Sequence, residues 1–317
     1  MILNIFLLVL GFVLLIKGAD IFVDGASSTA SNFKVSKMLI GLTIVAFGTS
    51  APEFAVSMQA ISSGNTDMVI GNVIGSCILN ILLILGVAAV IKPLKIRDNT
   101  VKKELPICLL MSSLLVVLFL DVRINNDMID RLTRSDAFVI LLFFTIFLYY
   151  LIKLARQKKE NPDEEKPKYK LWKSLLFVAI GLAGIIIGSD LVVDSASYIA
   201  KGLGVSQRVI SLSVIAFGTS LPELVTTIVS SRKGEQDLLL GNIIGSNVFN
   251  ICVVLGIPVA LFGTITPSSF KAIDLIVLVG SSLLLFIFST SKRTISRIEG
   301  ILMLIGFFVY YLLVMVL

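Results

Sequence analysis

The sequence contains no histidine and only three cysteines among its 317 residues. The missing imidazole excludes histidine acid–base catalysis and histidine metal ligands. Cys77, Cys108 and Cys252 are far apart in the chain and form no Cys-x-x-Cys pair. Neither a disulfide framework nor a zinc site is therefore predicted.

Charge is also scarce, since only 15% of the residues are charged, 56% are hydrophobic and the mean hydropathy is +0.98. These values lie outside the range of soluble globular domains and indicate a membrane protein. Apolar stretches near the ~20 residues that cross a bilayer recur ten times. They lie near 2–25, 37–62, 68–91, 104–122, 135–155, 171–193, 206–231, 237–262, 271–290 and 297–316.

These stretches read as helices rather than barrel strands. Runs such as ILNILLILGVAAVI (78–91) do not alternate apolar and polar residues as a membrane β-strand does. Lipid leaves only helices and closed barrels as spanning structures. The sequence therefore predicts an all-α membrane protein with ten transmembrane helices.

Basic residues predict the orientation of these spans. Lys and Arg number 27 against 21 Asp and Glu, which gives a net charge of +6. If the amino terminus lies outside, most of the basic residues fall in inner loops, as the positive-inside rule requires. We expect a multi-pass cell-membrane protein with both termini extracellular. The excess of Lys and Arg in the inner loops explains the net positive charge. The bilayer is therefore the expected partner, and we expect no nucleic acid and no obligatory protein partner.

The chain repeats itself at an offset of 170 residues. The aligned pairs are GADIFVDGA (18–26) with GSDLVVDSA (188–196), AFGTSAPE (46–53) with AFGTSLPE (216–223), and GNVIGSCILN (71–80) with GNIIGSNVFN (241–250). Each copy holds five predicted spans, an odd number, so the second copy must enter the membrane from the opposite side. We predict a first repeat over 1–152, a charged cytoplasmic linker over 153–173 and an inverted repeat over 174–317. Inverted repeats with broken central helices are typical of secondary transporters.

The segment AFGTSAPEF (46–54) predicts a break in a membrane helix. Pro52 has no amide hydrogen and its ring pushes against the carbonyl of Gly48, so the helix must bend or unwind there. Thr49 supplies a hydroxyl on the face that carries Glu53, four residues later. Carbonyl, hydroxyl and carboxylate oxygens together form a cluster of hard ligands, which Ca²⁺ and Na⁺ prefer.

Two carboxylates distinguish this pattern from ordinary helix packing. Gly, Ser, Thr and Pro are common in membrane helices as packing and kink residues. An ionised carboxylate at mid-bilayer, however, costs about 2.5–3.5 kcal/mol and is functional by default. Glu53 and Glu223 occupy matching places in the two repeats, without a basic partner in their spans. They therefore predict a cation site.

On these motifs the chain resembles the sodium/calcium exchanger family of the prokaryotic type, within the wider cation/calcium antiporter group. That family carries GTSxPE and GNxxGSxxxN/D in both inverted repeats, and the resemblance covers the whole chain. It implies a midplane site between the broken second and third helices of each repeat, with the first and sixth helices sliding across a fixed core. The implied ligands are the carbonyls of Ala46 and Ala216 and the side chains of Thr49, Ser50, Glu53, Ser76, Asn80, Thr219, Ser220, Glu223, Ser246 and Asn250.

Asn250 departs from the aspartate that many sodium/calcium exchangers carry in the second repeat. Only two carboxylates remain, so the predicted cage carries a charge of −2, which one Ca²⁺ or two Na⁺ would neutralise. We predict Na⁺/Ca²⁺ antiport, with both ions as substrates and no cofactor. A Ca²⁺/H⁺ antiporter using the same two glutamates remains the alternative. A cation channel is disfavoured because it would need a continuous pore, which an inverted repeat with two broken helices does not readily form. An enzyme is not expected because no base, nucleophile or cofactor motif accompanies the carboxylates.

Other residues have predicted structural roles. Asp20 and Asp24, matched by Asp190 and Asp194, are expected to anchor or cap helix ends at the membrane interface, with a role in gating as the alternative. Asp67 and Asp237 are expected to cap the third and eighth spans. The glycines expected to allow close helix approach are Gly71, Gly75, Gly241 and Gly245.

Overall fold

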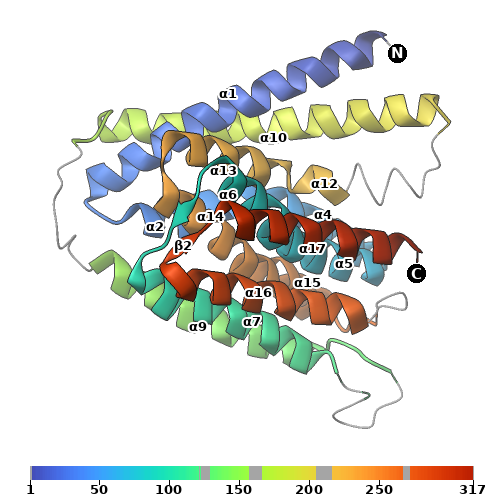
Figure 1. The fold of residues 1–317 in the computed structure, drawn as a ribbon. Helices are drawn as coiled ribbons and strands as arrows, with labels where there is room; N and C mark the ends of the chain where they lie inside the picture. The colour runs from blue at the N-terminus through green and yellow to red at the C-terminus, as the bar shows by residue number, and fades with distance from the viewer. Residues whose placement is uncertain are drawn as a thin grey trace. The chain divides into compact units, whose positions relative to one another are not determined.

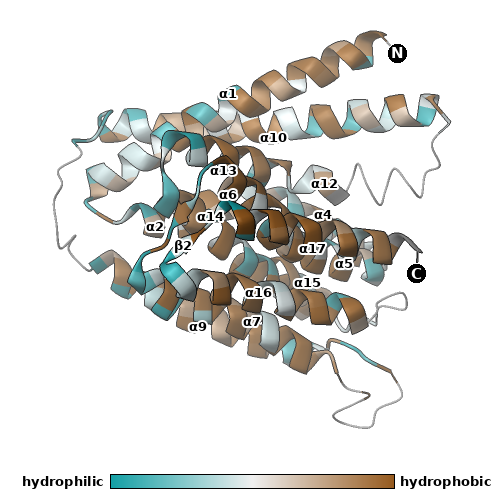
Figure 2. Cartoon of the chain, viewed as in Figure 1, coloured by the Kyte–Doolittle hydropathy of each residue, from teal (hydrophilic) through white to brown (hydrophobic). Residues whose placement is uncertain are grey.

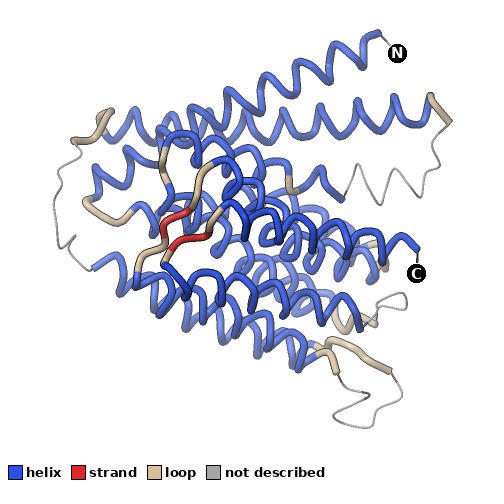
Figure 3. The backbone as a smooth tube through the Cα atoms, viewed as in Figure 1, coloured by secondary structure: helices blue, strands red, loops and turns tan. Residues whose placement is uncertain are grey.

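The computed structural model describes residues 2–120, 122, 129–156, 166–204, 216–266 and 272–316. Within these ranges the chain is almost entirely helical (Figures 1 and 3). One two-stranded antiparallel sheet is described, in which β1 (Leu94–Lys95) pairs with β2 (Thr294–Ile295). The all-α prediction is confirmed.

The described part of the first half contains five helical segments, three of which include π-helical turns (labelled η). They are α1 (Ile2–Phe33); α2 (Lys37–Ile40), η1 (Gly41–Val45), α3 (Ala46–Thr49) and α4 (Ala51–Ser62); α5 (Thr66–Leu79), η2 (Asn80–Leu85) and α6 (Gly86–Ile91); η3 (Thr100–Glu104) and α7 (Leu105–Leu118); and α9 (Arg134–Arg156).

The second half has a similar order. It contains α10 (Leu171–Gly202); α12 (Ala216–Thr219) and α13 (Leu221–Lys233); α14 (Gln236–Phe249), η5 (Asn250–Leu255) and α15 (Gly256–Phe262); α16 (Ala272–Lys292); and α17 (Arg297–Val316). Residues 206–215, the start of the predicted seventh span, lie outside the described ranges.

The described helices are long and apolar enough for a multi-pass membrane protein. Seven of them could each cross a membrane, or eight if the bent pair α2–α3 and α4 counts as one span. Figure 2 shows hydrophobic residues along most of α16 and α17. The chain is thus a helical membrane protein with several spans.

The helices pack into two compact units, each of which takes segments from both sequence repeats. Unit 1 comprises Met1–Pro52 and Ala155–Asn242, and unit 2 comprises Glu53–Leu154 and Ile243–Leu317. Helices of one repeat therefore pack against helices of the other within each unit. The repeat boundaries remain a prediction about the organisation of the sequence.

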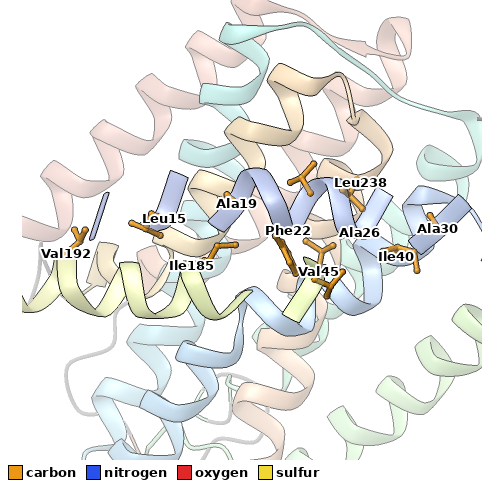
Figure 4. Close-up of a cluster of buried hydrophobic side chains, with 12 residues drawn as sticks. Leu15, Ala19, Phe22, Ala26, Ala30, Ile40, Val45, Ile185, Val192 and Leu238 are labelled. Atoms are coloured by element: carbon orange, nitrogen blue, oxygen red, sulfur yellow. The ribbon is translucent and has the colours of Figure 1, made fainter. Parts of the chain in front are cut away.

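In unit 1, α1 and α10 lie side by side in opposite directions (Figure 1). Glycines allow the close approach, since a Cβ added at Gly18 would lie 2.9 Å from the Gly181 carbonyl, and one at Gly11 would lie 2.9 Å from the Gly188 carbonyl. These two contacts exchange under the 170-residue offset, as a two-fold relation between the repeats requires. The apolar cluster around Phe22 takes residues from both helices, among them Leu15 from α1 and Ile185 from α10 (Figure 4).

Ion pairs join α1 to Lys168 and Lys233 at a point well before the end of α1. Lys233 lies 2.8 Å from Asp20 and 2.7 Å from Asp24, and Lys168 lies 2.7 Å from Asp24. The hydrogen bond to Asp24 raises the pKa of Lys168 above its ordinary value. Because α1 continues to Phe33, the expectation that Asp20 and Asp24 lie near a helix end was wrong. They tie α1 to the end of α13 instead.

In unit 2, α7 packs against α16 and α6 packs against α17. The hydroxyls of Ser112 and Ser282, which occupy matching positions of the two repeats, lie 3.0 Å apart. A Cβ added at Gly300 would lie 2.9 Å from the Gly86 carbonyl.

Some local expectations need correction. The side chain of Asn65 accepts from the amide of Met68 and caps α5, whereas Asp67 lies in the first turn of that helix. Asp237 likewise lies in the first turn of α14. Gly241 does allow close approach, because an added Cβ would lie 2.6 Å from the Met38 carbonyl. At Gly71 and Gly75 the structure describes nothing within 4 Å of such a Cβ. Among the described residues, Gly71 and Gly75 therefore do not mediate close packing.

Candidate functional site

Both GTSxPE motifs break their helices at the serine. Ser50 separates α3 from α4 with φ −86° and ψ 6°, and the two helical pieces are bent by 45°. Ser220 separates α12 from α13 with φ −91° and ψ 6°. The two breaks have nearly the same backbone geometry, and each is followed two residues later by a proline that cannot donate a helical hydrogen bond. The predicted break is confirmed.

Each buried glutamate lies in the first turn of the helix that starts after its break. Glu53 lies in α4 and Glu223 in α13, and both are 0% exposed. A helix amino terminus carries a partial positive charge, which stabilises a carboxylate there. The fold thus offsets part of the cost of burying each carboxylate.

In unit 1 the two repeats meet at Glu223. The hydroxyl of Ser50, which comes from the first repeat, donates to Oε1 of Glu223 at 3.1 Å. The hydroxyl of Thr49 lies 3.1 Å from both the Val45 carbonyl and Oδ1 of Asn242, and it can donate its proton to only one of them at a time. Thr49 and Ser50 are 0% exposed. When such a hydroxyl donates its proton, its oxygen lone pairs stay available to a cation.

Backbone carbonyls near the two breaks accept hydrogen bonds from different kinds of donor. The carbonyl of Ala46 already accepts the amide of Ser50 at 3.0 Å. The carbonyl of Gly218, which Pro222 leaves without a helical donor, accepts the hydroxyl of Ser189 on α10 at 2.9 Å. Sequence reasoning missed Ser189, although its counterpart in the first repeat is an alanine, Ala19, and that difference was visible.

In unit 2, asparagines connect the helices around the second motif. Asn72 Nδ2 donates to the main-chain carbonyl of Glu53 at 3.0 Å and to the hydroxyl of Ser57 at 2.9 Å. Asn80 Nδ2 donates to Oδ1 of Asn247 at 3.0 Å, again joining the two repeats. Asn72 and Asn247 were not predicted from the sequence. They hold the backbone around the predicted ligands in place.

Two predicted ligands of unit 2 have buried polar atoms that make no hydrogen bond within the described ranges. Among the described residues, Asn80 Oδ1 and both side-chain polar atoms of Asn250 have no hydrogen-bond partner. Both asparagines are 0% exposed, and each begins a π-helical turn, η2 or η5. π-Helical turns often occur at functional sites. An amide oxygen that is buried without a partner is suited to bind an ion or water.

The predicted ligands are distributed over both units. Unit 1 contains Ala46, Thr49, Ser50, Ala216, Thr219, Ser220 and Glu223, whereas unit 2 contains Glu53, Ser76, Asn80, Ser246 and Asn250. Ser76 is 4% exposed, Ser246 is 0% and Ser220 is 1%. Over the described ranges, no group of three or more His, Cys, Asp and Glu side chains could hold a metal. Any cation site here must therefore take most of its ligands from hydroxyl, amide and carbonyl oxygens.

Comparisons with known proteins identify the family. A family model described as sodium/calcium exchanger protein matches residues 3–153 and 173–316. The putative antiporter CaxA of Alkalimonas amylolytica is 39% identical over 98% of both chains. The sodium/calcium exchanger MaX1 of Methanosarcina acetivorans is 34% identical, also over 98% of both chains.

A solved structure agrees with these relatives. It is the sodium-calcium exchanger NCX_Mj soaked with 10 mM Na⁺ and zero Ca²⁺, which superimposes with a TM-score of 0.85 at 35% identity, over 99% of this chain and 98% of that one. These matches support a cation/calcium antiporter of the membrane, and they confirm that the chain is a transporter rather than an enzyme. The family match passes over residues 154–172, within the predicted linker. The chain belongs to the sodium/calcium exchanger family.

Proposed function

We propose that the chain exchanges Na⁺ for Ca²⁺ across the cell membrane by alternating access at one shared cation site. The observation that carries this proposal is the buried hydrogen bond between Ser50 and Glu223. It joins the two repeats at their helix breaks, where oxygen ligands for a hard cation gather.

The proposed ligands are the twelve residues predicted from the resemblance. They are Ala46, Thr49, Ser50, Glu53, Ser76, Asn80, Ala216, Thr219, Ser220, Glu223, Ser246 and Asn250. Burial of both glutamates and the spare amide oxygens of Asn80 and Asn250 support this assignment. So does the hydroxyl oxygen of Thr219, which is buried without a hydrogen-bond partner in the described part of the chain.

Coupling follows from the cost of leaving two buried carboxylates bare. An empty carrier would have to change conformation with both charges uncompensated, which a low-dielectric site opposes. A carrier loaded with Na⁺ or Ca²⁺ is neutralised and can move. Because both ions use the same oxygens, entry of Na⁺ on one side displaces Ca²⁺ for the return step.

We further propose ten spans in two inverted repeats, with both termini extracellular. The matched contacts of the α1 and α10 glycines and of Ser112 with Ser282 support a two-fold relation. The segments η3–α7 and α12–α13 would supply the remaining spans. Reporter fusions at each terminus test the orientation: both should be accessible from outside, and a cytoplasmic signal at either end would contradict it.

Proteoliposomes test the exchange and separate it from Ca²⁺/H⁺ antiport. An imposed Na⁺ gradient should drive uptake of radiolabelled Ca²⁺, and a pH gradient without Na⁺ should not. Glu53→Gln and Glu223→Gln should each lower uptake by at least about 100-fold, because each removes half of the charge that binds the cation. Uptake that follows pH and ignores Na⁺ would favour the proton antiporter.

Glu104→Gln provides a matched control. Glu104 is also a buried glutamate, 1% exposed, but it pairs with the hydroxyl of Tyr150 and is not among the proposed ligands. Na⁺-driven uptake should persist in this variant. Equal loss of uptake in all three variants would show that the effect comes from burial and folding rather than from cation binding.

A further inference from the structure

Helix α13 has an apolar face and a polar face. Leu221, Val225 and Val229 pack against the apolar cluster of α1 and α10. The opposite face carries Thr226, Thr227 and Ser230, which lie within about 60° of Glu223 at ~100° per residue. We call Thr226, Thr227 and Ser230 the hydroxyl row. It starts one turn after Glu223 and continues towards the carboxyl end of the helix.

The hydroxyl row is buried and its hydrogen-bonding capacity is unused. The exposed fractions of Thr226, Thr227 and Ser230 are 1%, 0% and 1%. Within the described ranges, none of the three hydroxyl oxygens has a hydrogen-bond partner. Burying a hydroxyl without a partner is costly, so three of them on one helix face indicate a site that binds something polar.

Several other buried hydroxyls in this chain bond to a carbonyl of their own helix. Thr29 donates to the Gly25 carbonyl at 2.7 Å, one turn back along its own helix. Thr43 and Ser112 make the same kind of bond, to the carbonyls of Leu39 and Cys108. The hydroxyl row differs from these self-bonded hydroxyls. The other buried hydroxyls without a partner in the described ranges, those of Ser197, Thr219 and Ser289, each lie alone on their helix.

The row also distinguishes the two repeats. At the matching positions in α4, the first repeat has Val56, Ser57 and Ala60. Two of the three hydroxyls are therefore replaced by apolar side chains in the same local fold. Helix formation does not require the row, so it serves something that the second repeat alone performs.

Charges of both signs gather at the carboxyl end of α13. The helix ends at Lys233, and the carboxyl end of a helix attracts cations. The ammonium of Lys233 would oppose this, but Asp20 and Asp24 both bind it, at 2.8 and 2.7 Å. The positive charge of Lys233 is thereby compensated, whereas Arg232, also in the last turn, has no ion pair among the described residues.

We propose that the hydroxyl row is a one-sided path for hard cations, Na⁺ or Ca²⁺, between Glu223 and the carboxyl end of α13. This inference rests on the proposed function and assigns that site's route to one face of the membrane, the cytoplasmic face in the proposed orientation. Neutral hydroxyls bind hard cations weakly. An ion can therefore leave each hydroxyl again, as conduction requires.

The double variant Thr226→Val with Ser230→Ala tests the path, because it gives α13 the residues of α4 with little change in volume. Flux of radiolabelled Ca²⁺ is measured in inside-out and right-side-out vesicles. We expect the cytoplasmic Ca²⁺ concentration for half-maximal exchange to rise by about tenfold or more, with the extracellular value changing less than about twofold. Equal changes at both faces, or no change at either, would overturn the proposal.

Thr29→Val is the matched control. It removes a hydroxyl that is equally buried, 0% exposed, but already bonded within its own helix. Neither face should respond to this change by more than about twofold. A cytoplasmic effect as large as that of the double variant would also count against the proposal.

A labelling experiment decides the inference even if the wild-type chain carries no Ca²⁺ flux. Ser230→Cys should react with a small cationic thiol reagent and should be protected by Na⁺ or Ca²⁺, whereas Ala60→Cys, at the matching position of α4, should not react. The wild-type chain, whose three cysteines are buried, gives the background. If Ser230→Cys stays unmodified under all ionic conditions, the row is not a cation path. Protected labelling without any Ca²⁺ flux would keep the path and overturn the proposed exchange.

Discussion

A hydrogen bond joins Ser50 at one helix break to Glu223 just after the other, although the two residues are 173 apart in the chain. The bond is buried, and a hydrogen bond to a charged group contributes more than one between neutral groups. It fixes one carboxylate oxygen of Glu223 in direction. A cation bound by Glu223 would therefore meet ligands that are already in position.

Replacing Ser50 tests that positioning. Ser50→Ala should weaken Ca²⁺ binding by about ten- to 100-fold, since a hydrogen bond to a charged group is worth ~1.5–3 kcal/mol. Isothermal titration calorimetry on the purified protein measures the change. Ser113→Ala is the control, because that hydroxyl bonds only to the Leu109 carbonyl of its own helix at 2.8 Å. Identical affinities in the two variants would contradict a role of Ser50 in the site.

Asn250 determines how much charge the proposed site carries. With Glu53 and Glu223 as its carboxylates, the site is neutralised by two Na⁺ or one Ca²⁺. Wild-type exchange should then move no net charge and be insensitive to membrane potential. Asn250→Asp adds a third carboxylate and should favour a third Na⁺, which makes exchange voltage-dependent by up to about 2.3 kcal/mol at ~100 mV.

Radiolabelled Ca²⁺ uptake into proteoliposomes with a K⁺ and valinomycin clamp measures this voltage dependence. The wild-type rate should be the same at zero and at about 100 mV, a potential that would change it by roughly 50-fold if one charge moved in a fully coupled step. A wild-type rate that depends steeply on potential would show that a third Na⁺ binds without a third carboxylate.

At the scale of the elements, the pairing of α1 with α10 depends on glycine. A Cβ at Gly181 would lie 2.5 Å from the Phe22 amide nitrogen and 2.7 Å from the Gly18 carbonyl oxygen. Both are main-chain atoms, which cannot yield as a flexible side chain can. The two helices can keep this distance only while the position has no side chain.

Gly181→Ala should therefore destabilise the protein by about 1–3 kcal/mol through overpacking. Gly280→Ala on α16 is the control, because nothing described lies within 4 Å of its added Cβ, and replacing a helix glycine should stabilise slightly. Thermal unfolding in detergent, followed by size-exclusion chromatography, compares the two variants. Equal midpoints would show that the α1–α10 contact tolerates a side chain.

At the scale of the whole molecule, both compact units combine segments of the two repeats. Each repeat alone lacks the helices against which its own helices pack. Folding and ligand binding should therefore be linked, because the proposed ligands come from both repeats. A bound cation would stabilise the assembled chain relative to the unfolded one.

Calcium should raise the unfolding midpoint, and chelation should reverse the rise. At a free concentration 100 times the dissociation constant, stabilisation should reach about 2.7 kcal/mol. The same titration on Glu223→Gln should give a much smaller shift, while Glu104→Gln should behave like the wild type. A shift that survives in Glu223→Gln would place the stabilising ion elsewhere.

Much of the fold class and of the candidate site could be predicted from local information. Hydropathy depends on residue content, so the helical membrane class follows from composition. Pro52 and Pro222 break their helices through their own covalent structure, wherever those helices pack. The repeat showed that Glu53 and Glu223 correspond and predicted a cation site there, and the family resemblance supplied the wider set of ligands.

Only the tertiary structure decided which of these groups meet. Hydrogen bonds such as Ser50 to Glu223 and Ser189 to Gly218 join segments that are distant in the chain, and such contacts arise from packing between helices rather than from local propensity. The unpartnered hydroxyls of Thr226 and Ser230 could not be predicted from the sequence. The residue type is the same whether a hydroxyl is exposed, bonded within its own helix or buried without a partner. The sequence by itself determined which polar groups the chain brings into the membrane. The packing of the helices decided which of these groups are buried and without a partner.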